Sequence, residues 1–345
     1  MTKVLAIDVG TASVSAAIAE QNKESKFVIC DVLRCKYDAA DANASKALLI
    51  NLEKIFSECS RSHCNIDKIQ IGLSAPLCLQ KTVSTETLRQ NPNFPISKPE
   101  LFQAIEILKN QFSQNQSAAC DILETKIDGY TVLDPLGHKG RDLKIKANLL
   151  LISPSFKTFL KEMKDKFFPA SEFKIFSDSF IVKQAVLKFL SPKNDFLILD
   201  VGGEVSTIGD FTLPFGLRTI ERRMTSFLNI SCDTAQSFLR RFSSGSLDYS
   251  KERVLDKILN FSAEVLRDTL KERLNQIHFG GTKELFLTGA GANFSQFLKI
   301  SEKSSIAEVK ALKAQSFGNS FLNLGPLSGG EDTVLAALIS TYERV

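Results

Sequence analysis

Two stretches of the chain decide the fold: VLAIDVGTASVSAAIA at residues 4–19 and FLILDVGGEVSTIGDF at residues 196–211. Each begins with an apolar run, continues through Asp-Val-Gly into a tight turn, and ends in a second strand-like run. The two aspartates, Asp8 and Asp200, lie 192 positions apart (200 − 8 = 192). A unit repeated in this way predicts two lobes of common origin that face each other across a cleft.

The turns of the repeat suit a phosphate group, because glycine lets the backbone approach an anion closely and point its N–H groups at it. A third strand, 284–288, also ends in glycines. The residues predicted to bind nucleotide phosphates are Asp8, Gly10, Thr11, Ala12, Ser13, Asp200, Gly202, Gly203, Gly289, Ala290 and Gly291. Asp8 and Asp200 are also predicted to hold Mg²⁺ through water, since this ion keeps several of its waters. We therefore predict that the cleft holds the phosphates of a nucleotide together with Mg²⁺.

The pattern around the repeat is that of an α/β protein. Apolar alternation predicts strands at 3–7, 14–19, 26–37, 68–73, 121–127, 143–152, 196–199, 205–211 and 284–288. Helical spacing predicts helices at 45–59, 100–112, 156–167, 179–190, 219–242, 251–276 and 332–342. Three prolines at 91–99 break the chain before a small αββ unit.

These elements predict a division of the chain into lobes and an insertion. The predicted parts are a first lobe at 1–92 and 153–192, an inserted αββ subdomain at 93–152, a second lobe with a reduced, mostly helical smaller part at 193–317, and a C-terminal helix at 318–345 that returns to the first lobe.

Composition excludes some classes of function. The 43 basic and 39 acidic residues give a net charge of +4, which is too even to indicate a nucleic-acid partner. No apolar run approaches the roughly 20 residues that a membrane-spanning helix needs, and the N-terminus lacks the pattern of a signal peptide. The seven cysteines are an odd number, which favours reduced thiols over a disulfide framework. We therefore expect a cytoplasmic protein.

The motifs resemble those of the superfamily that contains actin, the heat-shock chaperones and the sugar kinases, whose two phosphate motifs and adenosine motif correspond to 8–13, 200–203 and 287–292. Within it the chain most resembles the bacterial cell-division protein FtsA, followed by PilM of type IV pili. The segment YTVLDPLGHKGRDL at 130–143 resembles a hairpin of the subdomain that FtsA carries in its first lobe. The resemblance implies a duplicated RNase H-like fold, bound ATP-Mg²⁺ and a scaffold role in cell division.

The same resemblance implies protein partners. These are further copies of the chain itself and proteins of division or pilus assembly, including an FtsZ-like tail peptide. Such partners would place a cytoplasmic protein at the inner face of the membrane.

The chain departs from the FtsA pattern in several places. Glu204 stands at the third glycine of the second phosphate motif, where a carboxylate would face the terminal phosphate unless it turns away. The ribose-binding helix has its nearest match at 235–239, without the acid or the base. The chain leaves no room after 243–246 for the strands with which FtsA binds the FtsZ tail. It also ends after a core-like helix, so a direct membrane anchor is not predicted.

Two further features leave alternatives open. Gln184, on the helix 179–190, is a candidate for orienting an attacking water, as a glutamine in a similar helix does in actin; the alternative is a polar residue on an amphipathic helix. A set of arginines in the second lobe predicts either a solvated helix face or a site for an acidic peptide. These are Arg218, Arg222, Arg223, Arg240 and Arg241.

Three classes of function remain. The first is an ATP-binding actin-like scaffold or filament protein of division or pilus assembly. The second is a small-molecule kinase. A kinase needs a catalytic base, and the chain has no acid-bearing motif beyond Asp8 near the first phosphate motif. The third is a nucleotide-free pseudo-enzyme whose insert recruits partners. We favour the first for binding, with at most weak ATPase activity because Glu204 would disturb the stabilisation of charge during phosphoryl transfer.

Overall fold

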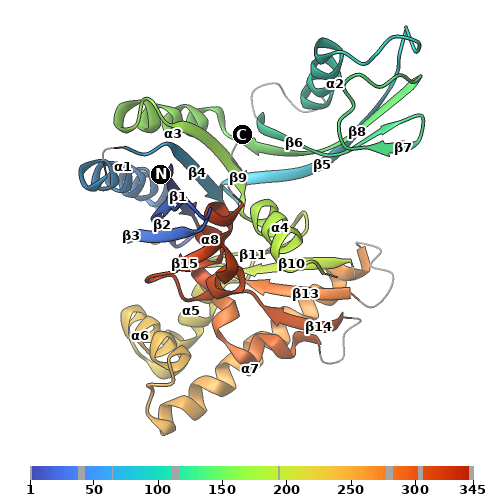
Figure 1. Cartoon of the computed structure of the whole chain (residues 1–345). Coiled ribbons are helices and arrows are strands. Elements are labelled where there is room, and N and C mark those ends of the chain that lie inside the picture. The colour runs from blue at the N-terminus through green and yellow to red at the C-terminus, as the bar shows by residue number, and fades with distance from the viewer. Residues whose placement is uncertain are drawn as a thin grey trace.

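The computed structural model describes residues 2–37, 43–63, 65–110, 117–192, 195–276, 283–301 and 306–341. These residues form two lobes, each built on one main sheet, with a third, smaller sheet that projects from the first lobe (Figure 1). The α/β class and the two-lobed architecture predicted from the repeat are therefore present.

A six-stranded sheet with the order β15-β3-β2-β1-β4-β9 forms the first lobe. Its strands are β1 (Thr2–Val9), β2 (Ser13–Gln21), β3 (Phe27–Lys36), β4 (Lys68–Leu73), β9 (Glu172–Ser177) and β15 (Phe321–Asn323). Alternate residues of β1 serve the two faces of this sheet. Leu5 and Ile7 pack under α1 (Ala44–Ser62) and α3 (Pro154–Phe167), whereas Val4 and Ala6 face the other lobe.

A five-stranded sheet with the order β12-β11-β10-β13-β14 forms the second lobe. Its strands are β10 (Phe196–Val201), β11 (Ser206–Ile208), β12 (Phe211–Leu213), β13 (Lys283–Thr288) and β14 (Ile306–Ala311). The helices α5 (Leu217–Leu228), α6 (Cys232–Ser243) and α7 (Tyr249–Gln276) share a hydrophobic core with one face. Residues 214–276 fold into these helices without a strand.

Two helices lie between the main sheets and join the lobes. They are α4 (Asp178–Phe189), which leads from β9 to β10, and α8 (Thr333–Ser340). One hydrophobic core contains Val4 of the first sheet, Phe286 of the second sheet, and apolar residues of both helices. All eight residues of α8 are buried, which is why its sequence is apolar on every side. Short 3-10 helices complete this region: η1 (Ala290–Asn293), η2 (Ser295–Ser301), η3 (Ala314–Ser320) and η4 (Gly330–Asp332).

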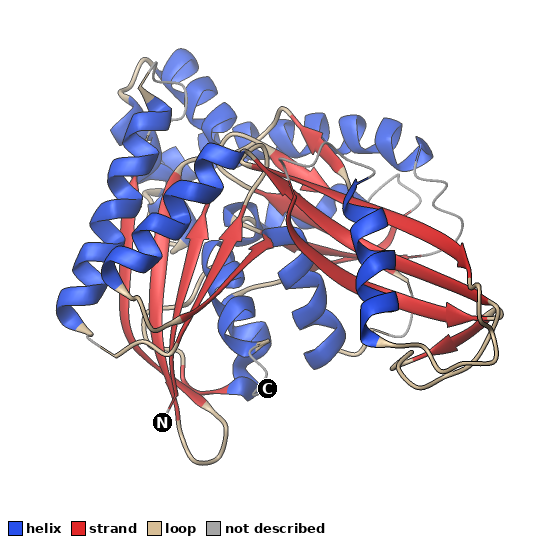
Figure 2. Cartoon of the chain, turned by 90° about the horizontal axis from the view of Figure 1, so that it is seen from above, coloured by secondary structure: helices blue, strands red, loops and turns tan. Residues whose placement is uncertain are grey.

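The projecting sheet has the order β5-β8-β6-β7. Its strands are β5 (Cys78–Leu88), β6 (Ser117–Ile127), β7 (Tyr130–Val132) and β8 (Asp142–Ile152), and α2 (Lys98–Asn110) packs on one face. Figure 2 shows a single helix lying along these strands. The apolar pattern of the sequence did not predict β5. Only its first residue is buried, so the strand lacks the apolar alternation by which strands are recognised.

The repeat is preserved in detail. Asp8 lies opposite Ser15 on its antiparallel neighbour and beside Gly72 on its parallel neighbour, and Asp200 lies opposite Thr207 and beside Thr288 in the same way. In the first turn Gly10 N–H donates to the Ser13 carbonyl at 3.0 Å, and in the second Gly202 N–H donates to the Val205 carbonyl at 3.1 Å. The two hairpins are therefore equivalent in strand register and in the hydrogen bond that closes the turn.

Candidate functional site

The two glycine turns meet in the cleft between the lobes. Ten of the eleven predicted phosphate-binding residues line one cavity of about 160 Å³, and only Gly291 does not. Gly291 packs against Val201, where a Cβ would overlap that side chain. The turns touch directly: a Cβ on Gly203 would overlap the Cβ of Ala12. The glycine at this position therefore allows the lobes to close.

A hydrogen bond joins the turns across the cleft. The backbone N–H of Glu204 in the second lobe donates to the Thr11 hydroxyl of the first lobe at 3.0 Å. The Tyr37 hydroxyl donates to the Gly10 carbonyl at 2.5 Å, and the Arg218 guanidinium donates to the Tyr37 carbonyl at 3.3 Å. Thr11, Tyr37 and Arg218 thus hold the lobes in a closed arrangement.

Three carboxyl groups converge on this cavity: Asp8 and Asp178 from the side of the first lobe and Asp200 from the second. Burial, together with the charges of Asp178 and Asp200, holds the pKa of Asp8 well above its usual range. Burial raises the pKa of Asp178 to about 8, against the effect of the Ser74 hydroxyl that donates to it. Burial also raises the pKa of Asp200 to about 6. Because burial disfavours their charged forms, these carboxyl groups bind protons more tightly than exposed aspartates do.

The Glu204 side chain turns away from the cavity. Both of its carboxylate oxygens accept hydrogen bonds from Arg222 on α5, at 2.7 and 3.2 Å. The sequence left two possibilities for this carboxylate: it faces the terminal phosphate, or it turns away. In the structure it turns away. Of the arginines considered as a solvated face, Arg218 is buried and forms an ion pair with Glu221 at 2.9 Å, so the set does not act as one surface.

The cavity residues fit phosphate groups and a hydrated cation. Asp8 Oδ1 and Asp178 Oδ1 are buried and accept no hydrogen bond from the described residues. Within the same residues no three acidic, histidine or cysteine side chains can ligate one metal ion, so a cation beside these oxygens would keep waters in its shell. Small-molecule sites span roughly 300–1,000 Å³. A cavity of about 160 Å³ is smaller, so entry of a whole nucleotide requires the lobes to move apart.

The structure adds Asp178 to the site and separates Gln184 from it. Asp178 is the first residue of α4 and follows β9, a strand that the sequence analysis did not include. The strand before Asp178 differs from those that carry Asp8 and Asp200: only two of the six residues of β9 are buried, so the local pattern does not indicate Asp178. Gln184 lies nearly two helical turns further along α4 and lines a different cavity. Gln184 does not line the cavity between the glycine turns, so its role in orienting water stays a prediction.

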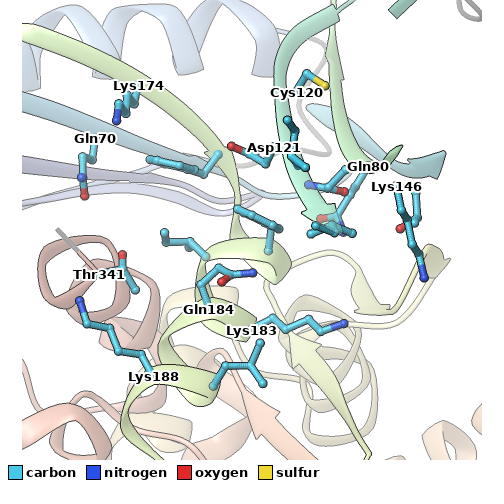
Figure 3. A pocket seen from close by; sticks show the side chains of 18 of the residues that line it. Gln70, Gln80, Cys120, Asp121, Lys146, Lys174, Lys183, Gln184, Lys188 and Thr341 are labelled. Carbon is cyan, nitrogen blue, oxygen red and sulfur yellow. The ribbon is translucent and has the colours of Figure 1, made fainter. Parts of the chain in front are cut away.

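That second cavity is a groove of about 1140 Å³ between the projecting sheet and the first lobe (Figure 3). It is bounded by β4, β9 and α4 on one side and by β5, β6 and β8 on the other. Its charged lining residues are Lys68, Lys146, Lys174, Lys183 and Lys188, and Asp121, Glu124 and Glu172. Five basic and three acidic groups leave an excess of positive charge in the lining. Burial raises the pKa of the Asp121 carboxyl group.

The groove contains two buried hydrogen-bond acceptors without donors among the described residues and one strand edge without a described partner strand. Gln70 Oε1 and Asn148 Oδ1 are buried in its lining and accept no hydrogen bond from the described residues. Five consecutive residues of β6, from Cys120 to Glu124, line the groove, and an irregularity in the strand register between Ile122 and Glu124 interrupts the alternation of side chains there. Because β7 pairs only with residues 125–127, the outer edge of β6 before residue 125 has no strand partner in the part of the chain that the structure describes.

No protein-family model matches the chain, and no curated protein does either. Solved structures are similar over nearly the whole chain. A PilM–PilN type IV pilus biogenesis complex gives a TM-score of 0.64 at 11% identity, covering 97% of this chain and 97% of the other. The ethanolamine utilization protein EutJ from Carboxydothermus hydrogenoformans gives 0.51 at 11% identity over 98% and 89%. A diol dehydratase-reactivating factor in nucleotide-free form gives 0.51 at 8% identity over 98% and 99%.

These likenesses establish the fold: the chain has the actin-like, two-lobed fold. The helices of the described residues include none that is both long enough and apolar enough to cross a bilayer.

Proposed function

We propose that this protein is an actin-fold scaffold of the PilM kind, which docks an extended segment of a partner protein in the groove beside the projecting sheet. The observation that carries the proposal is the pairing deficit of the groove: an edge of β6 that no described strand pairs, beside two buried acceptors, Gln70 Oε1 and Asn148 Oδ1. The similar structure that contains PilM is a complex with PilN, which is a protein partner. Pilus assembly is the setting that this likeness favours.

The groove has the properties of a β-augmentation site. An extended peptide can pair its backbone with an open strand edge, and side-chain pockets then provide specificity. Gln70 Oε1 and Asn148 Oδ1 lack partners among the described residues, which is unfavourable. Because both atoms are buried, N–H groups of such a peptide would satisfy them only after the two side chains turn toward the groove. Lys68 already pairs with Glu172 at 2.6 Å, but the lining still holds more lysines than acids, and this excess favours a segment with acidic side chains.

Replacing the two acceptors should stabilise the protein while it removes docking. Leucine is close in size to both amides, so Gln70→Leu and Asn148→Leu should each raise the free energy of unfolding by about 1 kcal/mol, because a buried unsatisfied acceptor is lost. Urea unfolding measures this effect. Gln236→Leu is a matched control in which the amide already donates to Glu221, so this change should destabilise the protein. A loss of stability in Gln70→Leu and Asn148→Leu would show that both amides are satisfied in the native state.

Docking itself is tested with peptides. Random twelve-residue peptides displayed on phage are selected on the wild-type chain, and the enriched ones are titrated by fluorescence anisotropy. We expect acidic, β-prone peptides whose affinity falls about tenfold or more in the Gln70→Leu, Asn148→Leu double variant, which is the effect of roughly 1.4 kcal/mol. Peptides that bind both proteins equally would place the docking site elsewhere.

The interlobe cavity supports a second part of the proposal, binding of ATP with Mg²⁺ with slow or no hydrolysis. The glycine turns and Thr11 would hold the phosphates, and Asp8, Asp178 and Asp200 would hold the hydrated ion, which supplies positive charge to the phosphates. What supports this is the set of carboxylate oxygens in the cavity that accept no hydrogen bond from the described residues. The hydrogen bond between Glu204 and Thr11 must open first, because it uses groups that the phosphates would need.

Mg-ATP should therefore raise the melting temperature of the protein. Ligand at about 100 times its dissociation constant adds roughly 2.7 kcal/mol to the folded state. The shift should disappear in Asp8→Ala and persist in Gln184→Ala, which alters the groove and leaves the cavity intact. No shift in the wild type at millimolar Mg-ATP would reject nucleotide binding and leave the partner groove as the function of the fold.

A role in cell division, as FtsA has, is the second candidate. It is favoured by the projecting sheet, which the sequence relates to the inserted subdomain of FtsA. Residues 214–276, where the resemblance would put the FtsZ-tail site, are helical here. Binding of an FtsZ tail peptide to this protein, measured in the same anisotropy assay, would favour division over pilus assembly.

A further inference from the structure

Gln80 of β5 lies where the groove and the interlobe site come closest. It lines the groove, and it also lines a small cavity that contains Asp178 and Asp200 (Figure 3). Its side-chain Oε1 accepts two hydrogen bonds, one from the Ser177 hydroxyl and one from the Ser179 hydroxyl at 2.9 Å. The projecting sheet is thus fastened to the start of α4 through one amide.

The two serines flank the buried carboxyl group of the site. Ser177 is the N-cap of α4, and its hydroxyl oxygen accepts the Phe180 N–H at 3.3 Å. Asp178 stands between them; one of its carboxylate oxygens accepts from Ser74, and the other has no partner among the described residues. Because α4 runs from the first lobe into the second, its first turn is fixed to the cleft on one side and to the projecting sheet on the other.

We propose that Gln80 couples the groove to the interlobe site, so that filling either one changes the other. The inference rests on the proposed docking function of the groove. A strand added to β6 pulls on the projecting sheet, and Gln80 transmits the shift to residues 177–179 and so to the position of Asp178. By linkage, a change at Asp178 alters the groove by the same free energy. Gln80 is therefore a positioning residue that contacts neither phosphate nor metal.

Hydrogen exchange tests the coupling without any ligand. Asp178→Asn perturbs the cleft directly and is made in three backgrounds: the wild type, Gln80→Glu, which keeps an acceptor for both serines, and Gln80→Leu, which has none. We expect Asp178→Asn to change amide exchange along β5 and β6 by about fivefold in the first two backgrounds and by less than twofold in the Gln80→Leu background. Ser179→Ala, which removes one of the two donors, should give an intermediate response if the leucine variant folds poorly.

The outcomes separate coupling from mere fastening. A purely structural Gln80 would lower the melting temperature in Gln80→Leu but leave the response of β5 and β6 to Asp178→Asn unchanged, and that result would overturn the proposal. So would a wild-type background in which Asp178→Asn leaves β5 and β6 unaffected. Failure of peptide docking alone, with the Gln80-dependent response intact, would reject the proposed function of the groove and keep the coupling.

Discussion

As the pH rises from 5.5 to 8, the free energy of unfolding of Asp178→Asn should increase relative to that of the wild type by on the order of 3 kcal/mol. Burial raises the pKa of this carboxyl group to about 8, whereas an unfolded chain has the ordinary value of 3.8. Between these values the folded state binds more protons than the unfolded state, so wild-type stability falls as pH rises. Asparagine cannot ionise, so the variant lacks this part of the fall. Urea unfolding across this pH range measures the difference.

The matched control is Glu331→Gln, which removes a carboxylate from the exposed rim of the same cavity. Because Glu331 is exposed and Asp178 is buried, the difference between the two variants isolates the effect of burying a carboxyl group. Added Mg²⁺ should stabilise the wild type more at pH 8 than at pH 5.5, since the cation competes with protons for the cluster. A wild-type stability that rises steadily from pH 5.5 to pH 8 would contradict a buried cluster of carboxyl groups.

Gly203→Ala should weaken the closed arrangement of the lobes. The added methyl group would overlap the Cβ of Ala12 and lie 3.2 Å from the Ala12 nitrogen, so the turns must separate or the backbone must shift. Overpacking of this kind costs about 1–3 kcal/mol. We expect a lower urea midpoint and a larger radius of gyration in small-angle scattering, because separation of the turns breaks the hydrogen bond between Glu204 and Thr11.

A compensating change makes this expectation specific. Ala12→Gly removes the methyl group that Gly203→Ala would meet, so the double variant should recover most of the lost stability. Gly318→Ala is the control, since a Cβ at that glycine meets no atom within 4 Å. If Gly203→Ala has the wild-type midpoint and radius of gyration, the turns are not in contact in solution.

The sequence predicted the parts of the site that repeat. Asp8 and Asp200 carry the same local pattern of strand, Asp-Val-Gly turn and strand, so one hairpin supports the other. Asp178 has no such partner in the chain. It enters the cleft because β9 runs parallel to β4 and ends at the same edge as β1, and this follows from sheet order rather than from local pattern.

The groove was beyond prediction for a related reason. Its lining comes from the two sheets and α4, and residues such as Gln70 and Asn148 look like ordinary polar positions in their own strands. What distinguishes them is that their side-chain oxygens accept no hydrogen bond from any described residue. The groove that they line forms only when the whole fold is assembled. Gln184 shows the converse: it lies on a helix similar to the one that carries a water-orienting glutamine in actin, yet it lines the groove.

The burial of α8 has a consequence for how this protein is made. The sheet of the first lobe begins at residue 2, but the helix that covers its inner face is formed by residues 333–340. At roughly 5–20 residues per second, a ribosome needs on the order of half a minute to reach that helix. Before that helix is made, α4 can cover only part of this face, so the first lobe cannot complete its core until residues 333–340 have been added.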